Sequence, residues 1–338
     1  MKACYLEGPK NVYVKEIEKP EWKPGYALVR IVSMGICGSD VGAYRGLNKM
    51  VSYPRIIRHE LAGIVEKIAP DNKSGVKEGD RVVIDPYVWC GKCFPCSIGR
   101  NNCCEHLETL GVHRDGGMTE YLLHPDHMLV PCPDDVPWEL APLSEPLTIS
   151  LHGIHRARLQ AGEHFAINGA GAIGLLAAMA SLVYGAVPIL IDPVVERLEY
   201  AKSCGIEHVT TPDKAVEYIK EVTNGRGAEA VMEASGANPA ILACLDYVSF
   251  AGRIVYTGWP KGPTEYPTNL ITSKELDIMG GRNSRNEFPE ALELIRTGKV
   301  DIRKILTKIV TIDESADALV DLSDNPGNYL KIVVMNEQ

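Results

Sequence analysis

The chain has 338 residues, of which 45% are hydrophobic and 23% charged, and its formal net charge is -9. This composition is typical of a soluble protein with a sizeable core, and the length allows two domains. The negative charge argues against nucleic acids and anionic membrane surfaces as partners, because both are bound through basic patches. The N-terminus lacks the apolar segment of a secretory signal. We therefore expect a cytoplasmic location, where the ten cysteines are metal ligands or buried thiols before disulfides.

The first part of the chain, to about residue 150, contains short strand-like runs separated by glycine and proline pairs that form turns. The runs cover residues 26–33, 63–68, 81–84 and 121–123. They do not alternate with helical segments. This part of the chain is therefore predicted to be mainly β.

Four candidate metal ligands are spread over this first part: Cys37, the pair His59 and Glu60, and Glu145. A thiolate, an imidazole and a carboxylate all suit zinc, and a mixed set that leaves one position open is typical of a catalytic zinc ion. Each of these residues, taken alone, is more often a packed residue than a ligand. Their spacing does not define a site without a fold.

A second candidate site is compact in sequence and contains Cys90, Cys93, Cys96 and Cys104. Two successive C-x-x-C steps and a fourth thiol eight residues later can surround one tetrahedral ion with four thiolates, which predicts a structural zinc ion. An iron–sulfur cluster would favour a different fourth spacing, and disulfides suit the expected compartment poorly. Cys103 adjoins Cys104 and is an alternative fourth ligand.

From residue 151 the pattern changes to helices that alternate with apolar strands, which predicts a doubly wound parallel sheet. The strands are expected at 165–167, 188–191, 208–209, 230–233 and 252–257. The apolar run 175–191 is interrupted by Gly185 and Pro188, so it is predicted to be a buried helix and a buried strand, and no membrane span. A helix at 288–297 and short strands at 308–312 and 331–334 should return the chain to the β domain.

Gly169, Gly171 and Gly174 form a G-x-G-x-x-G motif between the first of these strands and a helix, which predicts a dinucleotide site. The glycines allow a tight turn, close approach of a pyrophosphate, and close packing of helix on sheet. Asp192 is placed to bind the ribose hydroxyls, and its charge favours NAD over NADP. Arg197 either flanks the adenosine or is a helix-surface charge. Residues 231–236 and 257–258 should line the cofactor path at the carboxyl edge of the sheet. The predicted cofactor-binding residues are Gly169, Gly171, Ala172, Ile173, Gly174, Asp192, Arg197, Gly236 and Gly258.

Together, GICGSD, the His-Glu pair, the cysteine run, EPL and GAGAIG, in this order, resemble the zinc-dependent medium-chain alcohol dehydrogenase family over essentially the whole chain. The branch of sorbitol, threonine and sugar-acid (galactonate-type) dehydrogenases is the most similar, because Glu145 stands where ethanol-type enzymes have a cysteine. The resemblance implies an α/β protein in which a GroES-like β catalytic domain (1–150 and 288–338) is interrupted by a Rossmann domain (151–287). It also implies NAD, two zinc ions per chain (one catalytic, one structural), and a homodimer or homotetramer.

By the same resemblance, Cys37 and His59 would ligate the catalytic zinc ion, and Glu60 or Glu145 would supply a carboxylate, directly or by exchange during turnover. Ser39 is similar to the hydroxyl that receives the substrate proton. Asp40 is similar to the acid that holds the zinc-bound histidine in position.

The sequence departs from the family in two places. Gly42 stands where ethanol-type relatives have a relay histidine, so water or a nearby carboxylate must complete the proton relay. Arg58 stands where the family usually has glycine; it is either a surface substitution or a group that grips a substrate carboxylate. Arg282 and Arg285 are solvated loop charges or assist Arg58, and three histidines are further candidates for binding polyol hydroxyls: His113, His152 and His155.

The sequence thus predicts an enzyme that transfers hydride from a secondary alcohol of a polyol or sugar acid (hexonate) to NAD. The substrate is expected to be a small, polyhydroxylated molecule, and zinc is expected to lower the pKa of the hydroxyl group that is oxidised. A threonine-type amino-alcohol dehydrogenase is an alternative, although a cationic amine should favour a more acidic cleft. A non-catalytic NAD-binding sensor module with only structural zinc is another alternative. The module would hold one zinc ion per chain and the enzyme two, so a metal count separates them.

Overall fold

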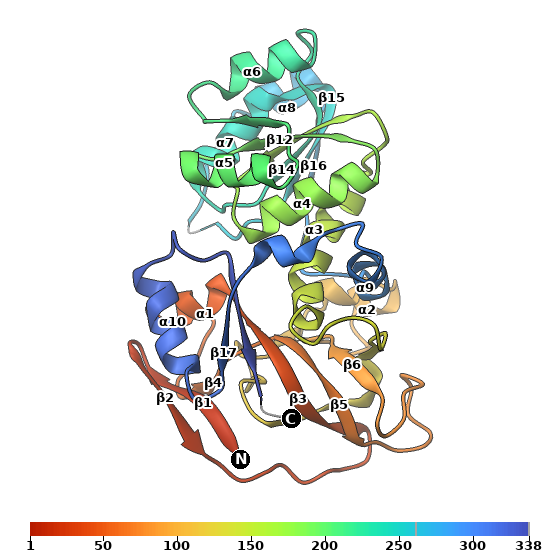
Figure 1. The fold of residues 1–338 in the computed structure, drawn as a ribbon. Helices are drawn as coiled ribbons and strands as arrows, with labels where there is room; N and C mark the ends of the chain where they lie inside the picture. The colour runs from red at the N-terminus through yellow and green to blue at the C-terminus, as the bar shows by residue number, and fades with distance from the viewer. Residues whose placement is uncertain (261, 337–338) are drawn as a thin grey trace. The chain divides into compact units, whose positions relative to one another are not determined.

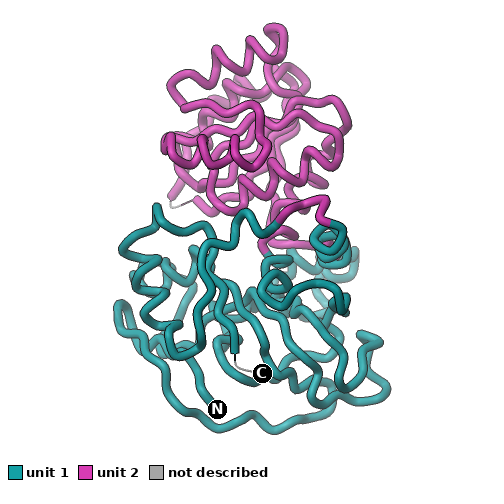
Figure 2. Tube along the Cα trace, in the orientation of Figure 1, with its two compact units in different colours: residues 1–145, 288–297, 302–338 teal, residues 146–287, 298–301 magenta. Residues whose placement is uncertain are grey.

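The computed structural model describes residues 1–260 and 262–336. The chain divides into two compact units, which Figure 2 shows in different colours. Unit 1 contains Met1–Glu145, Phe288–Thr297 and Ile302–Gln338, and unit 2 contains Pro146–Glu287 and Gly298–Asp301. The C-terminal part of the chain therefore rejoins the N-terminal part in one unit.

Unit 1 is built on a seven-stranded sheet with the strand order β10-β6-β5-β3-β18-β17, in which β9 also pairs with β3. Strand β18 runs antiparallel to β3, so the C-terminal strand completes the N-terminal sheet, as Figure 1 shows in blue and red. The strands are β3 (Tyr26–Ile36), β5 (Glu60–Lys67), β6 (Arg81–Ile84), β9 (Tyr121–Pro125), β10 (Leu129–Pro131), β17 (Leu306–Thr311) and β18 (Lys331–Met335).

Smaller elements surround this sheet. A three-stranded sheet has the order β2-β1-β4, and β7 pairs with β8. These elements and the helices of unit 1 are β1 (Lys2–Gly8), β2 (Asn11–Glu16), β4 (Arg55–Ile56), β7 (Tyr87–Val88), β8 (Glu108–Thr109), α1 (Gly38–Tyr44), α2 (Phe94–Ser97), α9 (Phe288–Arg296) and α10 (Ser315–Asp324). Helix α3 (Ser144–Ala157) begins in unit 1 and continues in unit 2.

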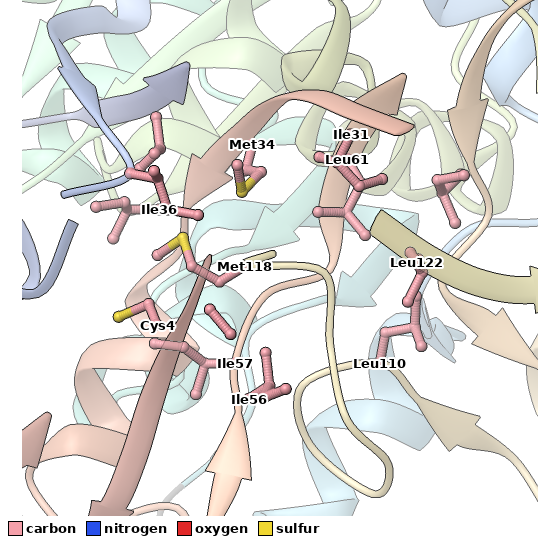
Figure 3. Close-up of a cluster of buried hydrophobic side chains, with 14 of the residues drawn as sticks. Cys4, Ile31, Met34, Ile36, Ile56, Ile57, Leu61, Leu110, Met118 and Leu122 are labelled. Atoms are coloured by element: carbon pink, nitrogen blue, oxygen red, sulfur yellow. The ribbon is translucent and has the colours of Figure 1, made fainter. Parts of the chain in front are cut away.

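The core of unit 1 lies against β3, whose residues are buried on both faces of the sheet and therefore form a nearly continuous apolar run. In Figure 3, Ile31, Met34 and Ile36 of β3 lie near Leu61 of β5 and Met118. This packing fixes the end of β3 and the start of β5, where the candidate ligands Cys37, His59 and Glu60 are found.

Unit 2 contains a six-stranded sheet of order β13-β12-β11-β14-β15-β16, in which every neighbouring pair is parallel. This is the predicted doubly wound parallel sheet, and together with the mainly β unit 1 it confirms the predicted α/β fold class. The strands and helices of unit 2 are β11 (His164–Asn168), β12 (Val187–Ile191), β13 (His208–Thr210), β14 (Ala228–Glu233), β15 (Val248–Tyr256), β16 (Asp277–Gly280), α4 (Ala172–Val183), α5 (Val195–Ser203), α6 (Ala215–Val222), α7 (Asn238–Tyr247) and α8 (Thr268–Lys274).

The apolar run at 175–191 forms the buried part of α4 and the strand β12. Across residues 1–260 and 262–336, none of the helices has both the length and the apolar character needed to cross a membrane.

Candidate functional site

The pairing of β3 with β5 brings three of the predicted ligands together. Cys37 follows the end of β3, and Glu60 begins β5 opposite Gly35 in the antiparallel register. The thiol of Cys37, a ring nitrogen of His59 and a carboxylate oxygen of Glu60 lie within 4.8 Å of one another. One sulfur, one nitrogen and one oxygen donor in this arrangement fit a zinc ion with an open coordination position.

Charge in this group also favours a cation. His59 and Glu60 are buried, and the Glu60 Oε2 atom has no hydrogen-bond partner among the described residues. Burial lowers the pKa of His59, but the hydrogen bond to Cys37 and the negative charges of Cys37 and Glu145 outweigh it and raise the pKa to about 10. A divalent metal ion bound here would offset the negative charges of Cys37 and Glu145 that act on the imidazole.

Glu145, the other predicted carboxylate, is buried at the start of α3 and accepts a hydrogen bond from the Tyr87 hydroxyl. Burial and the nearby charge of Glu60 raise the pKa of Glu145, although the charge of His59 opposes them. Glu145 thus interacts electrostatically with the ligand group but lies outside the set of atoms within 4.8 Å of one another. In this conformation Glu60 is the carboxylate that accompanies Cys37 and His59.

Two partners of these carboxylates were not foreseen in the sequence. Lys331, at the start of β18, is buried and forms an ion pair with Glu60, 271 residues away in sequence. Tyr87 binds Glu145 from β7. The only sequence feature that could have identified Lys331 is its place as the single charged residue at the start of the apolar run KIVVM. No comparable feature marks Tyr87.

Arg58 was expected to be either a surface substitution or a group that grips a substrate carboxylate, and the structure contradicts both hypotheses. Its side chain is fully buried and forms an ion pair with Asp40, so it is neither a surface charge nor a group presented to a substrate carboxylate. Asp40 accepts hydrogen bonds from Arg58 and from the backbone N–H of Cys37, at 3.0 Å, and none from His59 among the described contacts. Arg285 and Arg282 are exposed loop residues.

The Ser39 hydroxyl lies in the first turn of α1, next to Cys37 and Asp40. Its Oγ atom is buried and has no hydrogen-bond partner within the described part of the chain. A hydroxyl in this condition is available to a ligand that enters the site. Gly42, one turn further along α1, offers no side chain to continue a relay.

The glycine motif lies at the carboxyl edge of the sheet in unit 2, before the N-terminus of α4, which begins at Ala172 and Ile173. Gly169 has φ 112°, a conformation that favours glycine, and a Cβ atom on Gly174 would overlap the Gly169 carbonyl oxygen. The helix N-terminus therefore presents free backbone N–H groups beside a narrow turn, as a pyrophosphate site requires.

The Asp192 carboxylate is held beside this motif. It accepts hydrogen bonds from the backbone N–H groups of Ala170, at 2.7 Å, and Val194, at 2.9 Å. Arg197 lies 3.8 Å from the same carboxylate. Asp192 is thus fixed at the end of β12, where a ribose would be bound in a parallel sheet of this kind.

Two further turns lie at the same edge of the sheet, after β14 and β15. The Glu233 side chain accepts a hydrogen bond from the backbone N–H of Gly236, and the Glu233 carbonyl accepts one from Gly258. A Cβ atom on Gly236 would overlap Trp259, and one on Gly258 would overlap Gly236, so the two turns pack backbone against backbone. The structure therefore brings all the predicted cofactor residues to one edge of the sheet.

The four cysteines of the compact run also come together. The Sγ atoms of Cys90, Cys93, Cys96 and Cys104 lie within 4.8 Å of one another. Hydrogen bonds from the backbone N–H groups of residues 92 and 93 lower the pKa of Cys90 to about 6, which favours its thiolate form. Cys103 is not part of this group. The arrangement fits a closed tetrahedral zinc site with Cys104 as its fourth ligand.

The three candidate histidines are engaged by protein groups. His113 accepts a hydrogen bond from the Thr109 backbone N–H. His152 and His155, on successive turns of α3, both contact the Glu287 carboxylate, at 2.9 and 3.3 Å. Glu287 is buried and was not identified from the sequence. These contacts form a polar cluster within unit 2, in which His152 and Glu287 are buried and His155 is exposed.

This cluster predicts an acid-dependent part of the stability. Burial raises the pKa of Glu287, but hydrogen bonds from His152 and His155 outweigh it and lower the pKa to about 2. A carboxyl group with a lowered pKa stabilises the fold above its ordinary value near 4.5, and this contribution is lost as the pH falls toward 2. We expect Glu287→Gln to reduce the free energy of unfolding at pH 7 by about 2 kcal/mol after allowance for solvent screening. Urea unfolding measured across this pH range should show a shallower acid slope for Glu287→Gln than for the parent.

The control for this prediction is Glu265→Gln, which changes an exposed glutamate in the same unit. It should reproduce the parent curve. Parallel curves for the parent and Glu287→Gln would contradict the assignment of the acid slope to Glu287.

Comparisons with known proteins agree with this geometry. Residues 23–134 match the alcohol dehydrogenase GroES-like domain, and residues 172–297 match the zinc-binding dehydrogenase domain. The chain is 56% identical over 334 residues to an uncharacterized zinc-type alcohol dehydrogenase-like protein of Haemophilus influenzae, with 98% of each chain covered. It is 31% identical to the sorbitol dehydrogenase of Bacillus subtilis, with 99% of this chain and 97% of the relative covered. It is 33% identical to the L-galactonate-5-dehydrogenase of Escherichia coli, with 91% of each covered.

The crystal structure of the short chain alcohol dehydrogenase RspB of Escherichia coli CFT073, complexed with NADH, has a TM-score of 0.92 to this chain. It is 31% identical, and 99% of each chain is covered. Similarity of this extent, in sequence and in fold, is shared by members of one family. The chain therefore belongs to the zinc-type medium-chain alcohol dehydrogenases, in the branch that includes sorbitol and galactonate dehydrogenases, and is an oxidoreductase of that family.

Proposed function

We propose that the enzyme oxidises a secondary hydroxyl group of a polyol or sugar acid and transfers the hydride to NAD. The observation that carries the proposal is the group of Cys37, His59 and Glu60, whose three donor atoms lie within 4.8 Å of one another. The substrate class is supported by the relatives that act on sorbitol and galactonate.

In this proposal Cys37, His59 and Glu60 hold the catalytic zinc ion, and the cluster of four cysteines holds a second, structural one. When bound, the catalytic ion acts as a Lewis acid that lowers the pKa of the substrate hydroxyl. Ser39, whose buried Oγ atom has no partner among the described residues, receives the hydroxyl proton and passes its own proton to water or a nearby carboxylate. Glu145, held by Tyr87, is the second carboxylate available to the ion.

NAD is proposed over NADP because of Asp192. Its carboxylate is fixed beside the glycine motif by the Ala170 N–H, at 2.7 Å, and it would repel a 2'-phosphate. The glycine motif would bind the pyrophosphate through the N-terminus of α4. As in the sequence-based expectation, we also propose a homodimer or homotetramer.

The test is a panel of initial rates of nicotinamide reduction, run with NAD and with NADP. The panel contains hexonates such as galactonate and gluconate, the matched polyols galactitol and sorbitol, threonine, and simple secondary alcohols. We expect a hexonate or a polyol with NAD to exceed threonine and the simple alcohols by at least about a hundredfold in kcat/KM, because a site built to bind several hydroxyl groups rejects analogues that lack them. Preference for threonine, for a simple alcohol or for NADP would contradict the proposal.

A further inference from the structure

The backbone of Arg58 has an unusual conformation next to a proposed ligand. Its φ is 100°, a region that residues with a side chain rarely adopt. The segment around Gly111, Gly116 and Gly117 packs directly on it: a Cβ atom on Gly111 or Gly116 would overlap the Arg58 backbone, and Gly117 donates a hydrogen bond to the Arg58 carbonyl at 3.0 Å. Glycine would adopt this conformation without strain. An arginine here costs free energy, so contacts of its side chain are expected to offset the backbone strain.

The Arg58 side chain is fully buried and places Nη1 on the Oδ2 atom of Asp40. The same oxygen accepts a hydrogen bond from the Cys37 backbone N–H, at 3.0 Å. The Nε and Nη2 atoms of Arg58 are buried and have no hydrogen-bond partner in the described residues. Asp40 is therefore the counterion of a buried guanidinium, directly beside two proposed zinc ligands, Cys37 and His59.

His59 shows the consequence of this pairing. Its Nδ1 atom is buried and has no hydrogen-bond partner among the residues described. An imidazole that binds a metal usually donates its other N–H to a carboxylate or carbonyl, which increases the basicity and affinity of the ligand. Asp40 is close enough to act on His59 electrostatically, but its carboxylate is held by Arg58.

We propose that Arg58 is a positioning residue that holds the Asp40 carboxylate away from His59 and thereby weakens zinc binding by Cys37, His59 and Glu60. The guanidinium acts in two ways. It neutralises a negative charge that would attract a dication, and it occupies the carboxylate that would strengthen His59 as a ligand. This inference rests on the proposed catalytic zinc site.

The experiment measures zinc release from the zinc-loaded enzyme to an excess of a chromogenic chelator. Arg58→Met removes the charge and keeps the length of the side chain, and Arg58→Gly also removes the backbone strain. Both should release the ion from the Cys37 group about tenfold more slowly than the parent. Arg58→Lys keeps the charge and should release zinc more nearly at the parent rate. A purely structural role for Arg58 would have the opposite effect, because a loosened site releases zinc faster.

A double-variant cycle separates the charge from the hydrogen bond. Asp40→Asn leaves the guanidinium unpaired beside the site and should accelerate release about tenfold. The double variant Arg58→Met with Asp40→Asn removes both charges and should return to within about threefold of the parent. If Asp40 served His59 in the parent enzyme, the double variant would instead release zinc as fast as Asp40→Asn does.

Cys37→Ser identifies the relevant kinetic phase, because the phase that it abolishes belongs to the Cys37 group. If Cys37→Ser abolishes none of the phases, the proposed zinc site fails, and the inference fails with it. If one phase disappears but Arg58→Met and Arg58→Gly release that ion at the parent rate or faster, the zinc site stands and the inference about Arg58 is overturned.

Discussion

Cys37→Ser is expected to lower the turnover number by at least about a thousandfold, which corresponds to about 4 kcal/mol of transition-state stabilisation. Cys37 supplies the thiolate of the mixed donor group, and its sulfur lies within 4.8 Å of the donor atoms of His59 and Glu60. Serine has nearly the same shape, but its hydroxyl is neutral and binds zinc weakly at neutral pH. The zinc content should fall from the proposed two ions per chain, one for each of the two ligand groups, to one.

Cys103→Ser is the matched control. Cys103 is a partly exposed cysteine that lies outside both ligand groups. Its substitution should leave the zinc content and the turnover number unchanged, which would also confirm Cys104 as the fourth ligand of the cysteine cluster. If Cys37→Ser keeps two zinc ions and its activity, the catalytic zinc does not lie at Cys37. A parent enzyme with a single zinc ion would contradict the proposed count of two.

The parts of the structure that could be predicted are those whose physical cause is local in sequence. The glycine motif, the strand before it and the acid at residue 192 lie within 28 residues of one another, and β11, α4 and β12 appear where they were expected. The cysteine cluster is similarly compact. Strands β1 and β2, which were not predicted from the sequence, lie in a separate small sheet with β4.

The parts that could not be predicted depend on contacts between distant residues. Lys331 meets Glu60 because β18 is added beside β3, and this strand order cannot be read from either segment alone. The burial of Arg58 follows from the packing of the segment 111–117 on its backbone, 53 or more residues later. Residue type correctly indicated that Arg58 was unusual, but the tertiary structure decided which carboxylate it meets.

Gly174→Ala and Gly171→Ala are expected to fail in different ways, although both change the same motif. A Cβ atom on Gly174 would overlap the Gly169 carbonyl oxygen, so α4 must move away from the turn. We expect a loss of about 3 kcal/mol in the stability of unit 2 and a fall of roughly 10 °C in its thermal unfolding. A Cβ atom on Gly171 would have no neighbour within 4 Å, and its φ of -73° suits alanine. That variant should therefore fold as the parent does.

The cost of Gly171→Ala should appear only when the cofactor binds. Its added methyl group occupies the space through which a pyrophosphate approaches the N-terminus of α4, so the Kd for NADH should rise at least tenfold, or about 1.4 kcal/mol. Gly327→Ala is the control, because a Cβ atom there also has no neighbour within 4 Å and the residue lies in unit 1. Calorimetry measures the thermal unfolding of each variant, and NADH fluorescence titration measures its Kd for NADH. If Gly171→Ala binds NADH as tightly as the control, the pyrophosphate does not approach this turn. If it loses stability as Gly174→Ala does, the motif acts through packing alone.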